Sequence, residues 1–129
     1  MKFKFLTPKD NVGIVKATVH KTGKMGFSTG AIKVLSLDKN KYFKLALNED
    51  DENDTNLYLV LAKESDKDTF VTNKAGPYYY IKIKHVLDEL GVDYKSETII
   101  YDIREVKDSE VKCYKLSRRK STSKKQQNP

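Results

Sequence analysis

Cysteine, tryptophan and long apolar runs are scarce or missing in this chain of 129 residues. Cys113 is the only cysteine, so no internal disulfide can form and a reducing compartment is expected. No apolar run approaches the roughly 18–20 residues of a membrane span. The first ten residues, MKFKFLTPKD, lack the continuous apolar core of a signal peptide. We therefore expect a cytoplasmic protein without a membrane partner.

Side chains for metal binding and covalent catalysis are equally few. His20 and His85 are the only histidines, and with one cysteine they make no Cys/His metal set. Gly23 and Gly26 are isolated, so no glycine-rich phosphate loop is present. Cys113 lies within a strand-like run, where a free cysteine is usually a small packed apolar group. The sequence therefore predicts no enzyme, no cofactor and no metal site.

Charge, in contrast, is abundant. Charged residues make up 33% of the chain and hydrophobic residues 38%, so the core must be small. The net charge of +7 is uneven, because residues 118–129 hold five basic residues and no acidic one, which leaves +2 for the rest. Residues 117–129 are predicted to be a disordered basic tail. The tail is either a solubilising end or an arm that adds phosphate affinity through Arg118, Arg119 and Lys120.

The order of sequence patterns predicts two similar halves. Alternating apolar and polar residues predict short strands, and apolar residues three and four apart predict helices. The first half is expected to contain strands at Lys2–Leu6, Gly13–His20 and Met25–Phe27, a helix capped by Ser28 or Thr29, and strands at Tyr42–Leu47 and Leu57–Leu61. After a polar connector, the second half is expected to contain a strand at 70–72, a turn at 73–77, a strand at 78–81, a helix with Ile83, Val86, Leu87 and Leu90 on one face, and strands at 98–103 and 111–116.

These patterns predict a mostly β fold with two short helices, arranged like a β-barrel from tandem ββαββ halves. Residues 1–116 would form a single compact domain with pseudo-repeats at about 12–61 and 70–116. The alternative is an α+β fold, in which a single curved sheet carries the helices on one face.

The stretch GKMGFSTGAIKVLSL resembles the swapped-hairpin DNA-binding domains of the AbrB and SpoVT family. Gly23 falls on the turn glycine of that family, Lys24 on its basic neighbour, and Leu35 and Leu37 on the apolar pair at the helix end. The chain departs from the family pattern at three positions, where Ser28 replaces a proline, Ile32 a basic residue and Ser36 a glycine.

The resemblance implies a barrel that two chains normally build together. Here both halves would come from one chain, giving a monomeric pseudo-dimer or a homodimer. The resemblance also implies DNA contact through basic residues of the turn and the helix start. In this chain those residues are Lys21 and Lys24, with Lys74 as their counterpart in the second half.

Two further stretches have competing interpretations. On a strand, Tyr78 and Tyr80 share a face and Tyr79 takes the other, so the three rings form either a stacking platform for bases or ordinary packing. The acidic run from Glu49 to Asp54 lacks the glycine of an EF-hand calcium loop and is interpreted as a solvated hairpin tip.

The sequence thus favours a small nucleic-acid-binding protein of the transcriptional-regulator type, which contacts phosphates through turn lysines and a basic tail. The alternative is a non-enzymatic structural or protein-interaction accessory protein of the phage or mobile-element type.

Overall fold

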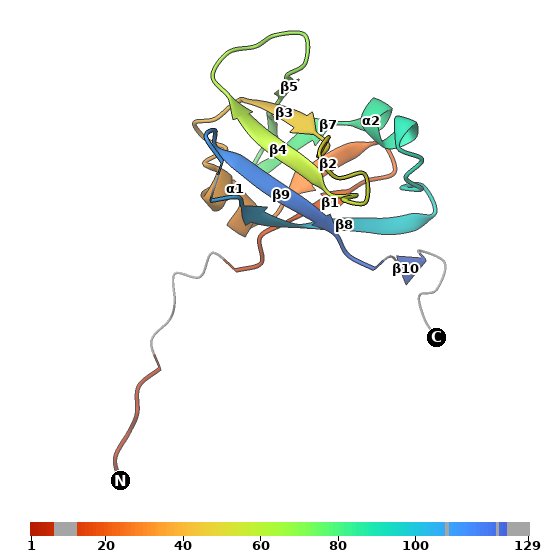
Figure 1. The fold of residues 1–129 in the computed structure, drawn as a ribbon. Helices are drawn as coiled ribbons and strands as arrows, with labels where there is room; N and C mark the ends of the chain where they lie inside the picture. The colour runs from red at the N-terminus through yellow and green to blue at the C-terminus, as the bar shows by residue number, and fades with distance from the viewer. Residues whose placement is uncertain (7–12, 108, 121, 124–129) are drawn as a thin grey trace.

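The computed structural model describes residues 1–6, 13–107, 109–120 and 122–123. Its strands form one antiparallel sheet that rolls into a nearly closed barrel, with two short helices (Figure 1). The elements are β1 (Lys16–Val19), β2 (Lys24–Phe27), α1 (Thr29–Leu35), β3 (Tyr42–Ala46), β4 (Leu57–Ala62), β5 (Phe70–Val71), β6 (Asn73–Ala75), β7 (Tyr78–Lys82), α2 (Lys84–Glu89), β8 (Glu97–Glu105), β9 (Cys113–Arg118) and β10 (Thr122–Ser123). The predicted fold class is therefore confirmed. Neither helix of the described residues has the length and apolar character needed to cross a membrane.

The strand order explains how the barrel closes. The sheet runs β5-β3-β4-β9-β8-β1-β2-β7-β6, and β10 adds to β8 outside this path. Its two end strands, β5 and β6, are consecutive in the chain and are separated only by Thr72, whose N–H donates to the carbonyl of Lys41 at 2.7 Å. One bent segment therefore pairs with β3 on one side and with β7 on the other.

The pairing pattern is unchanged when the two halves of the chain are exchanged. The hairpin β1–β2 corresponds to β6–β7, and β3–β4 corresponds to β8–β9. Because β1 corresponds to the whole bent segment β5–β6, the pair β1–β8 corresponds to the pair β5–β3. The pairs β2–β7 and β4–β9 each map onto themselves.

The two helices also end in the same way. Ser36 directly follows α1 and Gly91 follows α2 after Leu90, and both have positive φ, at 51° and 69°. The next residue in each half, Leu37 or Val92, donates its N–H to the carbonyl five residues earlier, at 3.1 and 3.0 Å. This is the hydrogen-bond pattern of a Schellman C-cap.

The helix starts differ between the halves. Ser28 caps α1 as predicted, because its Oγ accepts from the N–H of Ala31 at 3.2 Å. The same hydroxyl donates to the carbonyl of Ile14 at 2.7 Å and accepts from the N–H of Lys16 at 3.0 Å, which ties α1 to the start of β1. Ile83 occupies the corresponding position of α2 and makes no side-chain cap.

Inward-facing apolar residues from both halves fill the barrel. Ala17 and Val19 alternate with exposed or half-buried polar residues on β1, as the sequence predicts. Fully buried side chains from the other elements include Met25, Ala31, Leu35, Phe43, Leu59, Ile81, Ile83, Leu87, Ile99 and Leu116. A single core therefore serves both halves.

Three predicted boundaries are wrong. Lys2–Leu6 alternates like a strand, yet it forms none, and its side chains are exposed because no strand lies beside it. Asn73–Ala75 is a strand paired with β7, so the predicted turn shrinks to Gly76 and Pro77. The tail does not begin at residue 117, because β9 continues to Arg118 and pairs with β8. Residues 121 and 124–129 of the predicted tail lie outside the described residues.

Candidate nucleic-acid interface

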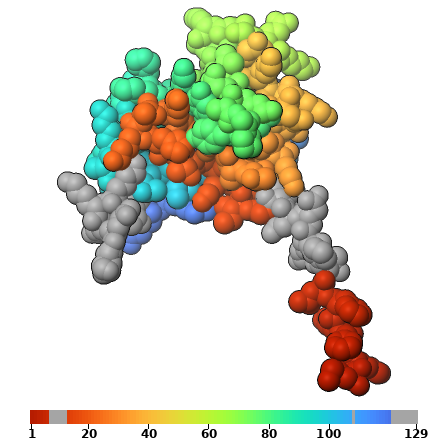
Figure 2. Space-filling model, turned by 180° about the vertical axis from the view of Figure 1, so that it is seen from behind, coloured from red at the N-terminus to blue at the C-terminus, as the bar shows by residue number. Residues whose placement is uncertain are grey.

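The chain separates its acidic residues from two lysine-bearing stretches of the sequence. Residues 13–37 and 69–87 contain no acidic residue, and seventeen of the eighteen acidic residues lie in residues 38–68 and 88–117. The two acid-free stretches carry Lys16, Lys21, Lys24, Lys33, Lys74, Lys82 and Lys84. They form the β1–β2 and β6–β7 hairpins, which are joined by the β2–β7 pairing and lie side by side in orange and green in Figure 2. The small net positive charge outside the tail is therefore concentrated in these two stretches, which we call the basic side, although Lys84 forms an ion pair with Asp88 and Lys16 lies opposite Asp102.

Two lysines of this side face each other directly. Met25 and Ile81 are opposite one another at the β2–β7 seam and point into the core. Their neighbours Lys24 and Lys82 are also directly opposite one another and point outward. Like charges in this position destabilise a sheet unless something neutralises them. Neither lysine forms an ion pair with any other described residue.

Three aromatic rings lie beside these lysines. The rings of Tyr78 and Tyr80 are stacked, with centroids 5.5 Å apart and planes inclined by 25°. His20 meets Tyr78 edge-on at 5.9 Å, and its Nε2 is hydrogen-bonded to the Tyr78 hydroxyl at 2.5 Å. We call His20, Tyr78 and Tyr80 the aromatic ledge. Partial burial raises the pKa of Tyr78, so its hydroxyl stays protonated at neutral pH.

Gly26 makes room for the ledge. Gly26 of β2 lies opposite Tyr80 of β7, and the Tyr78 side chain crosses over Gly26 to reach His20. A Cβ at Gly26 would lie 2.6 Å from Cζ of Tyr78, closer than real side chains approach. The absence of a side chain at Gly26 therefore leaves the space that the Tyr78 ring occupies.

The lysines predicted from the sequence occupy different places on this side. Lys24 holds its Nζ 4.7 Å from the ring centroid of Tyr80, on the outer face of the sheet. Lys74 holds its Nζ 5.6 Å from the ring of Tyr79, which belongs to the opposite face and packs against the core. Lys21 is exposed in the β1–β2 turn. The structure thus keeps Lys21 and Lys24 in one hairpin and puts Lys74 at another side of the barrel wall.

The arginines of the predicted tail are engaged within the molecule. Arg118 pairs with Glu97 at 3.3 Å. Arg119 binds the Asp102 carboxylate through Nε at 3.0 Å and Nη2 at 2.8 Å, and its N–H donates to the carbonyl of Ile100. Lys120 is exposed. Two of the three tail residues predicted to contact phosphates, Arg118 and Arg119, are therefore paired with acidic side chains of the same chain.

Lys82 follows the tyrosine stretch in the sequence but is not among the lysines predicted to contact phosphates. It has the same strand parity as Tyr78 and Tyr80, so alternation alone places it on their face. Its position opposite Lys24 depends on the β2–β7 register, which no local pattern reveals.

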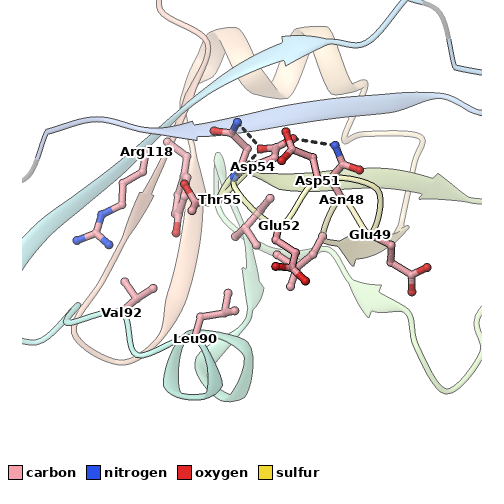
Figure 3. A pocket seen from close by; sticks show the side chains of 13 residues that line it. Asn48, Glu49, Asp51, Glu52, Asp54, Thr55, Leu90, Val92 and Arg118 are labelled. Atoms are coloured by element: carbon pink, nitrogen blue, oxygen red, sulfur yellow. Dashed lines mark hydrogen bonds between the residues drawn. The ribbon is translucent and has the colours of Figure 1, made fainter.

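A hollow of about 600 Å³ lies at the acidic loop between β3 and β4 (Figure 3). Its apolar lining includes Leu47, Leu57, Leu90, Val92 and Tyr101, and its polar lining includes Glu49, Asp51, Glu52, Asp54 and Arg118. Asp54 accepts hydrogen bonds from Tyr58, Asn48 and Asn56, which hold the pKa of its carboxyl far below the usual range. The loop predicted as a solvated tip thus borders a partly apolar hollow.

The described residues contain no group of three or more His, Cys, Asp or Glu side chains that could hold a metal ion. Cys113 is buried, and burial raises the pKa of its thiol. The lysines of the basic side can neutralise negative charge, and the aromatic ledge can form hydrogen bonds and stack on a flat ligand.

No protein-family model, curated protein or solved structure matches this chain. The AbrB and SpoVT resemblance stays a prediction, and the function must be argued from the residues at the site.

Proposed function

We propose that this chain is a small nucleic-acid-binding protein of the regulator type, and that it binds through the outer face of β1, β2 and β7. The observation that carries the proposal is the pair Lys24 and Lys82, two directly opposed cations in segments of the chain that hold no acidic residue. We call Lys16, Lys21, Lys24 and Lys82, together with the aromatic ledge, the basic face.

Phosphate groups supply the charge that this face lacks. A nucleic-acid backbone offers closely spaced anions, and each phosphate neutralised by lysine releases bound counterions. Binding of this kind weakens as salt rises, with a slope of about 0.7–0.9 per phosphate contacted. It carries little base information by itself.

The exchange symmetry of the strand pairing supports an AbrB-like interpretation in which one chain supplies both halves. On this proposal the protein is a monomeric pseudo-dimer, and only its first half carries the turn lysines Lys21 and Lys24 on the outer face. The nucleic acid would then contact the pseudo-dimer asymmetrically.

The test is a pair of charge reversals with equal net charge. Lys24→Glu with Lys82→Glu changes the basic face, and Lys63→Glu with Lys67→Glu changes two exposed lysines of the β4–β5 connector. Fluorescence anisotropy with a labelled 20-nucleotide strand should show that the first variant loses more than about tenfold in affinity. The slope of its log affinity against log salt concentration should be lower by about 2. The connector variant should lose much less affinity for the same strand.

Equal losses in the two variants would mean that only net charge matters, and the proposed face would be abandoned. Removal of residues 124–129 from the otherwise unchanged chain serves as a further control. Loss of all affinity in that truncated chain, with both double variants unaffected, would assign binding to the tail.

A second candidate is a protein-interaction role, favoured by the hollow at the acidic loop. Exposed Leu47 and Leu90 lie there beside Glu49, Asp51 and Glu52, a combination that suits a basic peptide with apolar side chains. A labelled peptide with the sequence of residues 1–6, which alternates lysine and phenylalanine, is a suitable probe. Saturable binding that Glu49→Lys with Glu52→Lys abolishes would support this role, and binding that survives the reversal would exclude it.

A further inference from the structure

We infer that the aromatic ledge stacks unpaired bases, so that the preferred ligand of the basic face is a single strand. The inference rests on the proposed function and narrows its substrate class. It starts from the position of the rings, because a stacking platform needs flat side chains on an exposed sheet face beside cations. Tyr78 and Tyr80 lie on that face next to Lys24 and Lys82.

The ledge is held in place before any ligand arrives. Tyr78 is fixed by the hydrogen bond to His20 and by the space above Gly26. Tyr80 stacks on Tyr78, and neither ring belongs to the buried core of the barrel. The rings are therefore preorganised, which reduces the entropy lost on binding.

Lys24 covers Tyr80 in a way that a base can replace. Its Nζ lies 4.7 Å from the ring centroid, at the end of a long flexible side chain. Lys24 is half-buried, and a contact between a lysine and a ring at the protein surface is weaker than base stacking on the same ring. A base can therefore take the position of the ammonium, and the ammonium can turn to the neighbouring phosphate. Lys82, directly opposite Lys24, lies within the same cluster of positive charge.

A single strand provides what this exchange needs, and a duplex does not. An unpaired nucleotide presents a free base and a phosphate one sugar apart, whereas a duplex presents phosphates and keeps its bases stacked inside. A highly charged polysaccharide presents anions only. The ledge should therefore distinguish these three polyanions, although the lysines attract all of them.

The experiment compares four probes with the full-length chain at one salt concentration. They are a 20-nucleotide oligothymidylate, the oligouridylate of the same length, a 20-base-pair duplex and heparin. We expect the single strands to bind about tenfold or more tightly than the duplex. Because the chain has no tryptophan, its tyrosine fluorescence can be followed directly, and single strands should quench it more than heparin does.

The variants Tyr80→Leu and Tyr80→Phe separate stacking from charge. Tyr80→Leu should lose about tenfold in affinity for the single strands and nothing for the duplex, while Tyr80→Phe keeps the wild-type values. Circular dichroism checks that both variants are folded. If Tyr80→Leu does not fold, the wild-type ratio of single-strand to duplex affinity and the fluorescence quenching decide the question.

The possible failures are distinguishable. Equal affinity for single strand and duplex, with no effect of Tyr80→Leu and equal quenching by heparin, would overturn the inference and leave the proposed function standing. Absence of binding to all four probes would overturn the proposed function as well.

Discussion

Ser36 occupies the backbone conformation that Gly91 occupies in the second half. It is the only non-glycine residue with positive φ among the described residues. The left-handed conformation costs a residue with a side chain about 1–2 kcal/mol, whereas glycine loses about 0.4–1 kcal/mol more conformational entropy on folding. The first effect is the larger one, so the serine carries a net penalty.

Exchanging the two cap residues tests this comparison. Ser36→Gly should raise the free energy of unfolding by about 0.5–1 kcal/mol, and Gly91→Ser should lower it by a similar amount. A Cβ at Gly91 meets no atom within 4 Å, so the cost there comes from the backbone alone. Urea denaturation measures both variants. A destabilising Ser36→Gly would contradict the account of this helix end.

Asp102 and Arg119 form the best-defined ion pair on the surface of β8. Hydrogen bonds from Arg119 hold the pKa of the Asp102 carboxyl below its usual range. A lowered pKa in the folded state stabilises the fold above the unfolded pKa of about 3.9, and this contribution is lost as the pH falls through the folded value. The Asp102 side chain is 44% exposed, so solvent screening keeps the contribution small.

Asp102→Asn should therefore lower the free energy of unfolding at pH 7 by less than about 1 kcal/mol. The difference from the wild type should shrink below about pH 4, where the wild-type carboxylate also begins to lose its charge. Asp38→Asn is the control, since Asp38 is exposed and forms no ion pair with a described residue. If the free energies of unfolding of Asp102→Asn and the wild type differed by the same amount from pH 7 to pH 2.5, the charge of Asp102 would not be the cause of the destabilisation.

At the scale of elements, the two hairpins meet where Gly23 touches the start of α2. The carbonyl of Gly23 accepts the N–H of Ile83 at 3.0 Å, and its φ is +86°. A Cβ at this position would lie 2.5 Å from Cβ of Lys84. The turn glycine therefore serves two purposes: it reverses the chain and lets β2 approach the second helix.

Gly23→Ala should lower the free energy of unfolding by about 3 kcal/mol, because backbone strain and overpacking both contribute. Gly76→Ala is the matched control in the corresponding turn of the second half, where φ is +60° and no atom lies within 4 Å of an added Cβ. It should cost only about 1 kcal/mol. Thermal unfolding of the two variants measures the difference, and equal costs would rule out the close packing described here.

The elements that the sequence predicted well have a strong local signal. Ile83 and Leu87 repeat with helical spacing and are both buried, and the alternation of Ala17 and Val19 fixes the inner face of β1. Asn73–Ala75 carries no apolar alternation, and it is a strand only because β7 lies beside it. Lys2–Leu6 shows the reverse case, since its alternation has no neighbouring strand to pair with.

The candidate site was predictable in part for the same reason. The shared face of Tyr78 and Tyr80 follows from strand parity and is confirmed. The opposition of Lys24 and Lys82 and the engagement of Arg119 by Asp102 depend on pairings between distant segments. Such pairings are set by tertiary packing, so a local pattern cannot supply them.

At the scale of the whole molecule, the main feature is the separation of charge around one barrel. The acid-free hairpins β1–β2 and β6–β7 form one side. Elsewhere, β8 carries Glu97, Asp102 and Glu105, and the acidic run from Glu49 to Asp54 lies in the loop between β3 and β4. At physiological salt the field of an exposed charge extends about 8 Å, so the directly opposed Lys24 and Lys82 reinforce one another, whereas Lys16 lies opposite Asp102 on β8 and is partly neutralised by it. A polyanion approaching the barrel would be oriented by this asymmetry before it makes contact.

Mapping of backbone amide shifts by NMR tests the central claim most directly. A ¹⁵N-labelled chain is titrated with the 20-nucleotide oligothymidylate at moderate salt, and the shift changes are placed on the fold. We predict that the largest changes fall on β1, β2 and β7, around Lys24, Tyr80 and Lys82. Changes confined to β3, β4 and β9, or to residues 118–129, would contradict the claim that the basic face binds nucleic acid.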